Sequence, residues 1–304
     1  MSGGLPDRLA SDACNACAVC EVGPRDGLQN ERAIIPARDK IRFVELLLSA
    51  GLREIEVTSF VSPRWVPQLA DAEEVLRGVV GAARDRGALL SALVPNEKGL
   101  ERALACGVGK VAVFTAASEG FARKNINASI AESVARFEPV VRGAHAAGVS
   151  VRGYVSCIVR CPYDGPVSPD AVAETAERLL AVGVDELDLG ETLGVATADE
   201  VERVLERCAR VRPLGEIVLH LHDTQGRAVE CVRRAVALGV RAFDASAGGI
   251  GGCPYAPGAA GNISTETLDR VLCELGYATS IDRGALAEAA GFIALALASA
   301  RAGG

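Results

Sequence analysis

Aromatic residues are scarce in this chain of 304 residues: phenylalanine, tryptophan and tyrosine make up 4% of it, whereas hydrophobic residues as a whole make up 49%. The core must therefore be built mainly from alanine, valine, leucine and isoleucine. Such a core is typical of helices that pack on buried parallel strands. The composition thus favours an α/β protein.

Three further features are missing, and each excludes a class of protein. Lysine and arginine are dispersed in a chain of net charge −7, so no basic patch exists for nucleic acid. The opening stretch MSGGLPDRLASDAC has no apolar segment for export, and we expect the ten cysteines to lie in a reducing cytoplasm. The longest apolar stretches, such as FIALALASA, are shorter than the ~20 residues of a membrane span, so no membrane partner is expected.

Eight short runs rich in β-branched residues alternate with longer helix-like segments. The runs are 17–22, 54–60, 88–94, 110–116, 149–158, 184–190, 216–222 and 240–246. Between them, apolar residues recur at helical spacing, as at Ile41, Val44, Leu47 and Leu48. Six of the helical segments end in a glycine just before the next strand: Gly51, Gly87, Gly107, Gly148, Gly183 and Gly239.

Eight such units without a long linker predict one closed parallel (β/α)8 TIM barrel, in a single catalytic domain over 1–304. An open doubly wound sheet would usually carry a nucleotide-binding fingerprint after its first strand, and none follows Val22. Residues 1–15 are predicted to be an N-terminal extension. Residues 264–304 are predicted to form the eighth helix and additional C-terminal helices, which pack on the barrel and contribute to a homodimer interface.

The stretch CEVGPRDGLQNERAIIP places two opposite charges, Arg25 and Asp26, just past the first predicted strand. In a TIM barrel the active site lies at the C-terminal ends of the strands. Taken alone, the two charges could form an ordinary surface ion pair. Glu56, however, lies inside the second strand, where a buried carboxylate needs a partner that Arg25 could supply. We therefore predict that Arg25, Asp26 and Glu56 are active-site residues.

The chain contains only three histidines, and two of them end the seventh strand in LHLHDTQG. His220 and His222 are two residues apart, so a strand presents both on one face. A lone buried histidine is usually structural, whereas a pair at a strand end indicates metal ligands. His145, near the end of a helix, has no such context and is predicted to be structural.

Two oxygen ligands complete the predicted metal site. Asp26 ends the first strand, which lies near the seventh in a closed barrel, and Asn262 ends the glycine-rich stretch AGGIGGCPYAPGAAGN. Two nitrogens and two hard oxygens suit one octahedral Mg²⁺ or Mn²⁺ ion, with zinc as the alternative. Cys253 lies in the same stretch, where a mobile lid could bring its thiol to the site for proton transfer. An incidental cysteine in a flexible loop is the other explanation.

Several motifs occur together in order along the chain. They are EVGPRDGLQNE (21–31), TSFVSPRWVPQ (58–68), KNIN (124–127), VRGYVSC (151–157), HLHDTQG (220–226) and GGCPYAPGAAGN (251–262). Together they resemble the 3-hydroxy-3-methylglutaryl-CoA (HMG-CoA) lyase family. The resemblance implies a metal-dependent TIM-barrel lyase that splits this acyl-CoA into acetoacetate and acetyl-CoA, a reaction of leucine degradation and ketone-body formation.

The resemblance also implies roles for single positions. Asp26, His220, His222 and Asn262 match the metal ligands of the family, Arg25 its catalytic arginine, Glu56 an active-site glutamate and Cys253 the signature-loop cysteine. Gln29 and Ser59 lie in two of the motifs and are candidates for substrate contacts. Arg32, Lys124 and Asn125 are candidates for CoA contacts.

The chain departs from the family at one position, and this leaves alternatives open. The stretch LGETLG has Glu191 where the family usually has an aspartate near the outer shell of the metal, and such a change can alter activity about 10- to 100-fold. A lyase for a bulkier branched 3-hydroxyglutaryl-CoA is therefore one alternative. A second is a Claisen-condensing relative, such as an isopropylmalate or homocitrate synthase, although these generally lack the glycine-rich lid and carry a large extra C-terminal region. A third is a barrel that only binds acyl-CoA.

Three cysteines near the N-terminus are spaced like ligands of a zinc or iron–sulfur site: Cys14, Cys17 and Cys20. Two of them, Cys17 and Cys20, are predicted to lie in the first strand and to face opposite sides. No fourth ligand follows nearby, so we predict buried thiols rather than a metal cluster.

Overall fold

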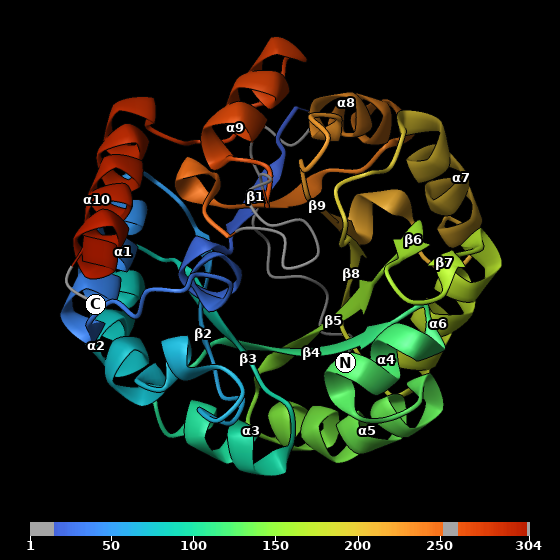
Figure 1. The fold of residues 1–304 in the computed structure, drawn as a ribbon, viewed down its shortest axis with the longest axis horizontal. Coiled ribbons are helices and arrows are strands. Elements are labelled where there is room, and N and C mark those ends of the chain that lie inside the picture. The colour runs from blue at the N-terminus through green and yellow to red at the C-terminus, as the bar shows by residue number, and fades with distance from the viewer. Residues whose placement is uncertain (1–14, 252–260, 303–304) are drawn as a thin grey trace.

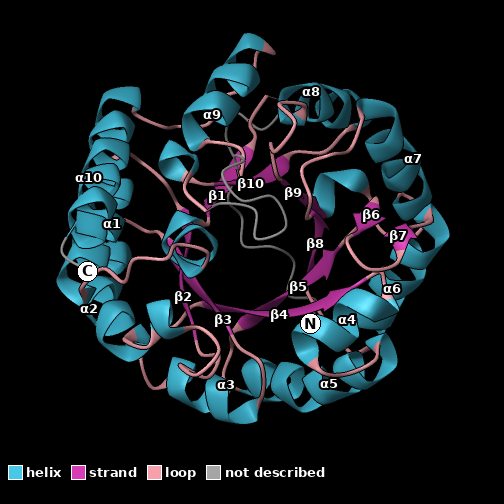
Figure 2. Cartoon of the chain, in the orientation of Figure 1, coloured by secondary structure: helices cyan, strands magenta, loops and turns pink. Residues whose placement is uncertain are grey.

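The computed structural model describes residues 15–251 and 261–302, and within them it confirms the TIM barrel. The parallel strands close into a ring in the order β1-β10-β9-β8-β5-β4-β3-β2, and helices surround the ring (Figures 1 and 2). The strands of the ring are β1 Ala18–Glu21, β2 Glu54–Ser59, β3 Leu89–Leu93, β4 Lys110–Ala116, β5 Ser150–Ser156, β8 Glu186–Glu191, β9 Ile217–Leu221 and β10 Ala242–Ala245. Each lies within about two residues of its predicted bounds.

A helix follows each strand on the outside of the ring. These helices are α1 Ala37–Ser49, α2 Ala72–Asp85, α3 Glu97–Leu104, α5 Ile130–Ala146, α6 Pro169–Ala181, α7 Ala198–Cys208, α8 Ala228–Leu238 and α9 Thr265–Glu274. Side chains at the starts of several helices accept backbone N–H groups, and Ser129 with Glu132 forms a full capping box at α5. The six glycines predicted to end helices all have positive φ, from 62° at Gly87 to 112° at Gly239, which explains the residue type at those positions.

The strands bury apolar side chains outward, against the helices, and polar ones inward. On β5, a Cβ added at Gly153 would lie 3.1 Å from the Leu179 side chain of α6, so this position faces outward. Arg152, the preceding residue, contacts carboxylates of β2, β8 and β10 across the interior. Because side chains alternate along a strand, β5 separates an apolar outer face from a charged inner one.

The C-terminal region also follows the prediction. After α9, the long helix α10 (Arg283–Ala302) packs on α1, as Figure 1 shows on the left of the barrel. Its buried stripe consists of Leu286, Ala289, Ile293 and Leu297. The single-domain bounds of 1–304 stay a prediction, since residues 1–14, 252–260 and 303–304 lie outside the described ranges.

The statement that every apolar stretch is too short to span a membrane is wrong for α10, whereas the expectation of no membrane partner stays a prediction. By length and composition alone, this is the one helix among the described residues that could cross a membrane. The expectation considered only the uninterrupted apolar stretch and missed the alanines and glycines before it. Because one face of α10 is buried against the barrel, length and composition are weak evidence here for a membrane span.

Two insertions were not predicted. A short helix, α4 (Glu119–Ile126), precedes α5, and a small hairpin of β6 (Arg160–Cys161) and β7 (Gly165–Pro166) follows β5. The two insertions touch each other, because Asp164 of the hairpin accepts hydrogen bonds from Ser118 Oγ and the Gly120 amide at the start of α4. The hairpin thereby supports the helix that carries Lys124 and Asn125 at the barrel mouth.

Candidate active site

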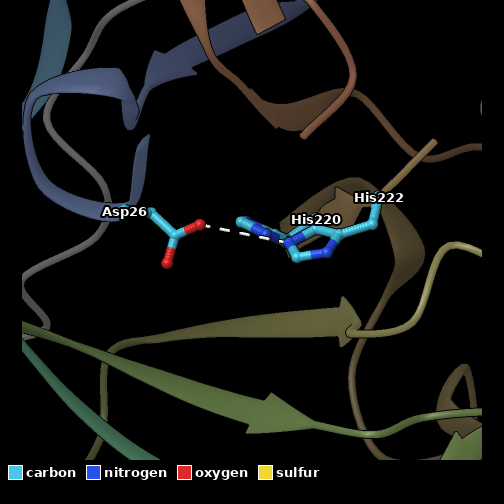
Figure 3. Close-up of side chains that lie close together, drawn as sticks. All are labelled: Asp26, His220 and His222. Carbon is cyan, nitrogen blue, oxygen red and sulfur yellow. Dashed lines mark ion pairs between the residues drawn. The ribbon is translucent and has the colours of Figure 1, made fainter. Parts of the chain in front are cut away.

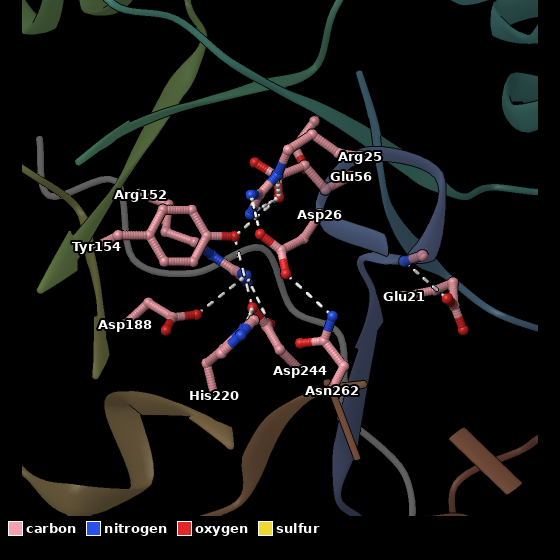
Figure 4. Close-up of polar contacts among 12 residues, drawn as sticks. Glu21, Arg25, Asp26, Glu56, Arg152, Tyr154, Asp188, His220, Asp244 and Asn262 are labelled. Carbon is pink, nitrogen blue, oxygen red and sulfur yellow. Dashed lines mark hydrogen bonds and ion pairs between the residues drawn. The ribbon is translucent and has the colours of Figure 1, made fainter. Parts of the chain in front are cut away.

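A single π-helical turn, Gly23–Gly27, carries Arg25 and Asp26 over the end of β1. The Val22 carbonyl accepts the backbone N–H groups of Arg25 and Asp26, at 3.1 and 2.7 Å. Gly23 is needed in this turn because an added Cβ would lie 2.6 Å from the Glu21 carboxylate. The tight turn directs both charged side chains toward the barrel axis, as Figure 4 shows.

Glu21 joins this turn to the other end of the chain. Its buried carboxylate accepts the amides of Gly23 and Ala247, both at 2.9 Å, and the Thr265 hydroxyl at 2.6 Å. Complete burial raises the pKa of Glu21 to about 7 despite these three donors. One carboxyl group therefore holds together the loop after β1, the loop after β10 and the start of α9.

The predicted contact between Arg25 and Glu56 is present. Arg25 donates from Nε to Glu56 Oε2 at 2.5 Å and from Nη1 to Asp26 Oδ1 at 2.5 Å, and its guanidinium lies 5.4 Å from the centre of the Tyr154 ring. Burial disfavours ionisation of Asp26, yet Arg25, His220 and His222 hold its pKa below its usual range. The arginine is thus locked between two carboxylates, with its position fixed before substrate binds.

His220 in β9 and His222 directly after it face the same cavity from the side opposite Asp26 (Figure 3). Their ring centres are 5.2 Å apart, and His222 Nε2 lies 4.0 Å from Asp26 Oδ2. Burial and the neighbouring His220 lower the pKa of His222 to about 4, so its ring is neutral at pH 7. Burial acts against the charge of His220 too, but its hydrogen bond to Asp244 raises its pKa overall.

Asn262 reaches the site because the returning chain pairs with the end of β9. The Ile263 amide donates to the Leu221 carbonyl at 3.0 Å, and a bridge joins Asn262 to His222. Asn262 Nδ2 then donates to Asp26 Oδ2 at 2.9 Å. All four residues predicted as metal ligands therefore meet at one point, although 236 positions separate Asp26 from Asn262 along the chain.

These residues fit a divalent cation. One atom each of Asp26, His220 and His222 lies within 4.8 Å of the others. Within the described residues, Asn262 Oδ1 is buried without a hydrogen-bond partner and could supply an oxygen ligand. A carboxylate, an amide oxygen and two imidazoles form a donor set for Mg²⁺ or Mn²⁺, and it contains no thiolate.

The site opens into a cavity of about 630 Å³, large enough for a drug-sized ligand. Of the predicted site residues, those that line it are Arg25, Asp26, Gln29, Lys124, Asn125, His220 and His222. Glu56 lies just behind Arg25 and is 1% exposed. At the rim, the loop after β2 adds Trp65, the sole tryptophan of the chain, whose side chain is 82% exposed.

Besides Glu56, four described residues of the predicted set do not line this cavity, and Asn262, which contacts Asp26, is one of them. Ser59 is buried and accepts the Val61 amide, and Arg32 is exposed elsewhere on the surface. Glu191 turns back onto its own loop, where it accepts the Gly194 amide at 2.5 Å, and burial raises its pKa to about 7. Its carboxylate thus supports the loop beside His222 rather than joining the group of candidate ligands. Cys253 lies outside the described residues.

Two predictions about residues outside the site agree with the structure. His145 pairs with Asp185 on the outside of the barrel, with Nε2 2.9 Å from Oδ2, as expected of a structural residue. Cys17 and Cys20 are buried free thiols, as predicted. Cys14 lies outside the described residues, so the absence of a metal cluster stays a prediction.

The sequence analysis missed the polar residues beneath the site. Tyr154, Asp188 and Asp244 surround Arg152 in the barrel interior, as Figure 4 shows, and both aspartates are at most 2% exposed. Their signal was the alternation of polar and apolar residues within VRGYVS and ELDLGE. We read these runs only as buried strands, without asking which face the polar residues share.

Comparison with known proteins now adds to this geometry. The model of the HMGL-like family matches residues 16–293. The chain belongs to this family. It is 50% identical over 273 residues to a hydroxymethylglutaryl-CoA lyase of Pseudomonas mevalonii, covering 90% of each chain. Related lyases are named mitochondrial in Bos taurus and cytoplasmic in Rattus norvegicus, so this similarity leaves the compartment open.

Solved structures agree with the assignment. A lyase of Brucella melitensis shares 46% identity and a TM-score of 0.90, covering 92% of this chain and 98% of the other. A lyase of Acinetobacter baumannii, solved with coenzyme A and 3-methylmalate, shares 34% identity and a TM-score of 0.87 over 93% and 92% of the two chains. The HMGL-like chains therefore share both the barrel and its strand order with this protein.

Proposed function

We propose that this protein cleaves 3-hydroxy-3-methylglutaryl-CoA into acetoacetate and acetyl-CoA. The observation that carries the proposal is the meeting of Arg25, Asp26, His220 and His222 in the lining of one cavity, with Asn262 hydrogen-bonded to Asp26. The names of the related lyases supply the substrate. Asp26, His220, His222 and Asn262 would hold one Mg²⁺ or Mn²⁺ ion, which supplies Lewis-acid activation of substrate oxygens and lowers the pKa of the tertiary hydroxyl.

Cleavage removes the hydroxyl proton, breaks the bond between the hydroxyl-bearing carbon and the carbon beside the thioester, and leaves the electron pair on the thioester fragment. Arg25 faces this cavity with N–H groups fixed by Glu56 and Asp26. The guanidinium N–H groups that these two contacts leave free donate to the thioester oxygen as it gains negative charge, a stabilisation worth about two to three orders of magnitude in rate. The two adjacent residues thus have different roles. Asp26 is a ligand in the proposed cation site, and Arg25 stabilises the negative charge that develops on the thioester oxygen.

The thioester fragment must then take up a proton to become acetyl-CoA. Cys253 remains our candidate donor on grounds of the family resemblance alone, acting from the glycine-rich stretch. Exchange of Cys253 for serine should slow turnover while leaving metal content intact, whereas unchanged turnover would exclude the role.

The CoA arm should extend toward the rim of the cavity, where Lys124 and Asn125 are placed to meet it. Trp65 makes a direct test possible, because it is the only tryptophan and lies at this rim. Adding CoA should change its fluorescence, and Lys124→Ala should weaken that response. If Lys124→Ala leaves the fluorescence response unchanged, the CoA arm does not bind beside Lys124. Arg32, which is exposed and outside the cavity lining, is the weaker candidate for a phosphate contact.

Acetoacetate formation tests the proposal, measured with hydroxymethylglutaryl-CoA in the presence of Mg²⁺ and again after EDTA treatment. The expected result is turnover that EDTA abolishes and added Mg²⁺ or Mn²⁺ restores. No product from this substrate, together with turnover of a bulkier 3-hydroxyglutaryl-CoA, would favour the alternative lyase. Glu191 keeps that alternative relevant, since it shapes the loop beside His222.

We further propose a homodimer in the cytoplasm. The outward face of α10 is unusually apolar, with Leu295 71% exposed, and this supports an interface with a second copy. The free cysteines among the described residues fit a reducing compartment. Light scattering of the native chain and of a Leu295→Lys variant tests the interface, and cell fractionation tests the compartment.

A further inference from the structure

Asp244 lies directly beneath His220 in the barrel interior. The two residues are opposite each other in the register of neighbouring strands β10 and β9, so both side chains point inward at the same level. Asp244 Oδ2 lies 3.1 Å from His220 Nδ1, and the Asp244 side chain is inaccessible to solvent. This contact therefore occupies Nδ1 and leaves Nε2 as the other ring nitrogen of His220.

The Asp244 carboxylate is itself held in place. Arg152 Nη1 donates to Asp244 Oδ1 at 2.9 Å, and the Tyr154 hydroxyl lies 3.5 Å from Oδ2. Arg152 is in turn fixed by Glu186 at 2.6 Å and Glu54 at 3.0 Å. Rotation of the Asp244 carboxylate would break its ion pair with Arg152 and its hydrogen bond with Tyr154, so these two residues hold its orientation independently of His220.

This arrangement dictates which nitrogen of His220 carries the proton. The guanidinium of Arg152 keeps Asp244 ionised, and an ionised carboxylate can only accept hydrogen bonds. His220 Nδ1 must therefore be the donor. In the neutral ring this leaves the lone pair on Nε2, the nitrogen available to a metal.

We propose that Asp244 is a positioning residue, which holds the His220 ring through Nδ1 and so presents Nε2 at the cation site beside Asp26 and His222. The inference rests on the proposed function only in assigning His220 to that site. It concerns the orientation of a side chain, and it can be tested without turnover.

The first experiment is nitrogen-15 NMR of the metal-free protein, followed to alkaline pH until the His220 signals no longer change and the ring is neutral. Three histidines give few signals, and His145 on the outside of the barrel serves as an internal reference. The expected result is a His220 ring with its proton on Nδ1. A His220 ring with its proton on Nε2 in the wild-type protein would overturn the proposal, whatever any variant does.

The second experiment uses Asp244→Asn, which keeps the size and removes the charge. In this variant the amide oxygen should turn to Arg152, leaving the NH₂ group to face His220. An NH₂ group can only donate, so Nδ1 must become the acceptor and the proton should move to Nε2. We expect this tautomer change in the NMR spectrum and a Mn²⁺ affinity about 10- to 100-fold weaker by titration calorimetry.

Asp188→Asn is the matched control. Asp188 is equally buried, contacts the same Arg152 nitrogen at 3.4 Å and hydrogen-bonds to Asp244, whereas His220 Nδ1 bonds to Asp244. The asparagine amide can still donate to Asp244, so this variant keeps the group that contacts His220. This variant should keep the wild-type tautomer and a Mn²⁺ affinity within about threefold. The proposal is wrong if Asp244→Asn leaves both readouts unchanged, or if Asp188→Asn alters them equally. If Asp244→Asn does not fold, the proposal is still tested by the His220 tautomer that NMR gives for the wild-type protein.

Discussion

Replacement of Arg25 by glutamine should separate the chemical role of this residue from its structural one. Arg25 is 6% exposed, and it is the basic partner within 2.5 Å of both Glu56 and Asp26. Removing one partner of a buried ion pair typically costs about 3–5 kcal/mol, because the other charge is left unpaired. We therefore expect Arg25→Gln to lower the free energy of unfolding by about 3 kcal/mol and kcat by two to three orders of magnitude.

Glu56→Gln and the double variant complete the test. Glu56→Gln leaves the guanidinium in place beside Asp26, so kcat should fall less than in Arg25→Gln. In the double variant both charges are gone, and much of the lost stability should return, with a coupling of about 1–3 kcal/mol. The kcat of the double variant should nevertheless stay as low as that of Arg25→Gln.

The assays are urea unfolding, acetoacetate formation under saturating substrate and Mn²⁺ content by electron paramagnetic resonance. Mn²⁺ content should be the same in all four proteins at saturating metal. Two results would refute the reasoning: loss of bound metal in Arg25→Gln, or recovery of kcat together with stability in the double variant. Either would mean that Arg25 acts by supporting the site rather than by contacting the thioester.

Three further predictions follow from the same structure. Burial raises the pKa of the Glu21 carboxyl group from 4.5 to about 7, so the stability that its protonated form contributes is complete below about pH 4.5 and is lost as the pH rises through 7. Relative to wild type, the free energy of unfolding of Glu21→Gln should therefore increase by about 3 kcal/mol between pH 4.5 and 8. The same pH dependence for both proteins in urea unfolding would contradict this. Lys124→Ala should raise KM for the CoA thioester about 3- to 10-fold at constant kcat, because Lys124 lines the cavity where the CoA arm is proposed to bind. KM for a truncated N-acetylcysteamine thioester should not change, and an equal effect on both substrates would exclude a CoA contact. Mn²⁺ at 100 times its dissociation constant should stabilise the protein by about 2.7 kcal/mol, and His222→Ala should abolish the shift in melting temperature.

The sequence was sufficient for the barrel and for the ends of its strands. Helix-terminating glycines and β-branched runs are local signals, and eight repeats of them leave little choice of topology. Once the barrel is assumed, Asp26 and the pair His220 and His222 must meet, because they end strands separated only by β10 in the ring. The Arg25–Glu56 contact followed from the same geometry, since a carboxylate inside β2 needed a nearby cation.

Other features depend on distances between side chains and on strand register, which cannot be read from the sequence. The glutamate in LGETLG was predicted near the metal, but its extra methylene lets it reach the Gly194 amide of its own loop. The helix α4 was not predicted as a separate element, because it is only eight residues long and residues 127–129 alone separate it from the longer α5. The hydrogen bonds of Asp244 could not be predicted either, since they require the relative register of β5, β9 and β10.

The barrel interior shows why a cation belongs at the mouth. Branched aliphatic side chains usually fill a TIM barrel, yet here charged contacts run from the lower barrel to the catalytic turn. Among the described residues, the acids of this network are Asp26, Glu54, Glu56, Glu186, Asp188 and Asp244, and its bases are Arg25, Lys110 and Arg152. Three acids are therefore in excess, and unbalanced buried charge is costly. Burial, together with Asp244, raises the pKa of Asp188 far above its usual range, so that group keeps its proton. The negative charge left in this network would be partly neutralised by a divalent ion beside Asp26, and this favours metal binding at the mouth of the barrel.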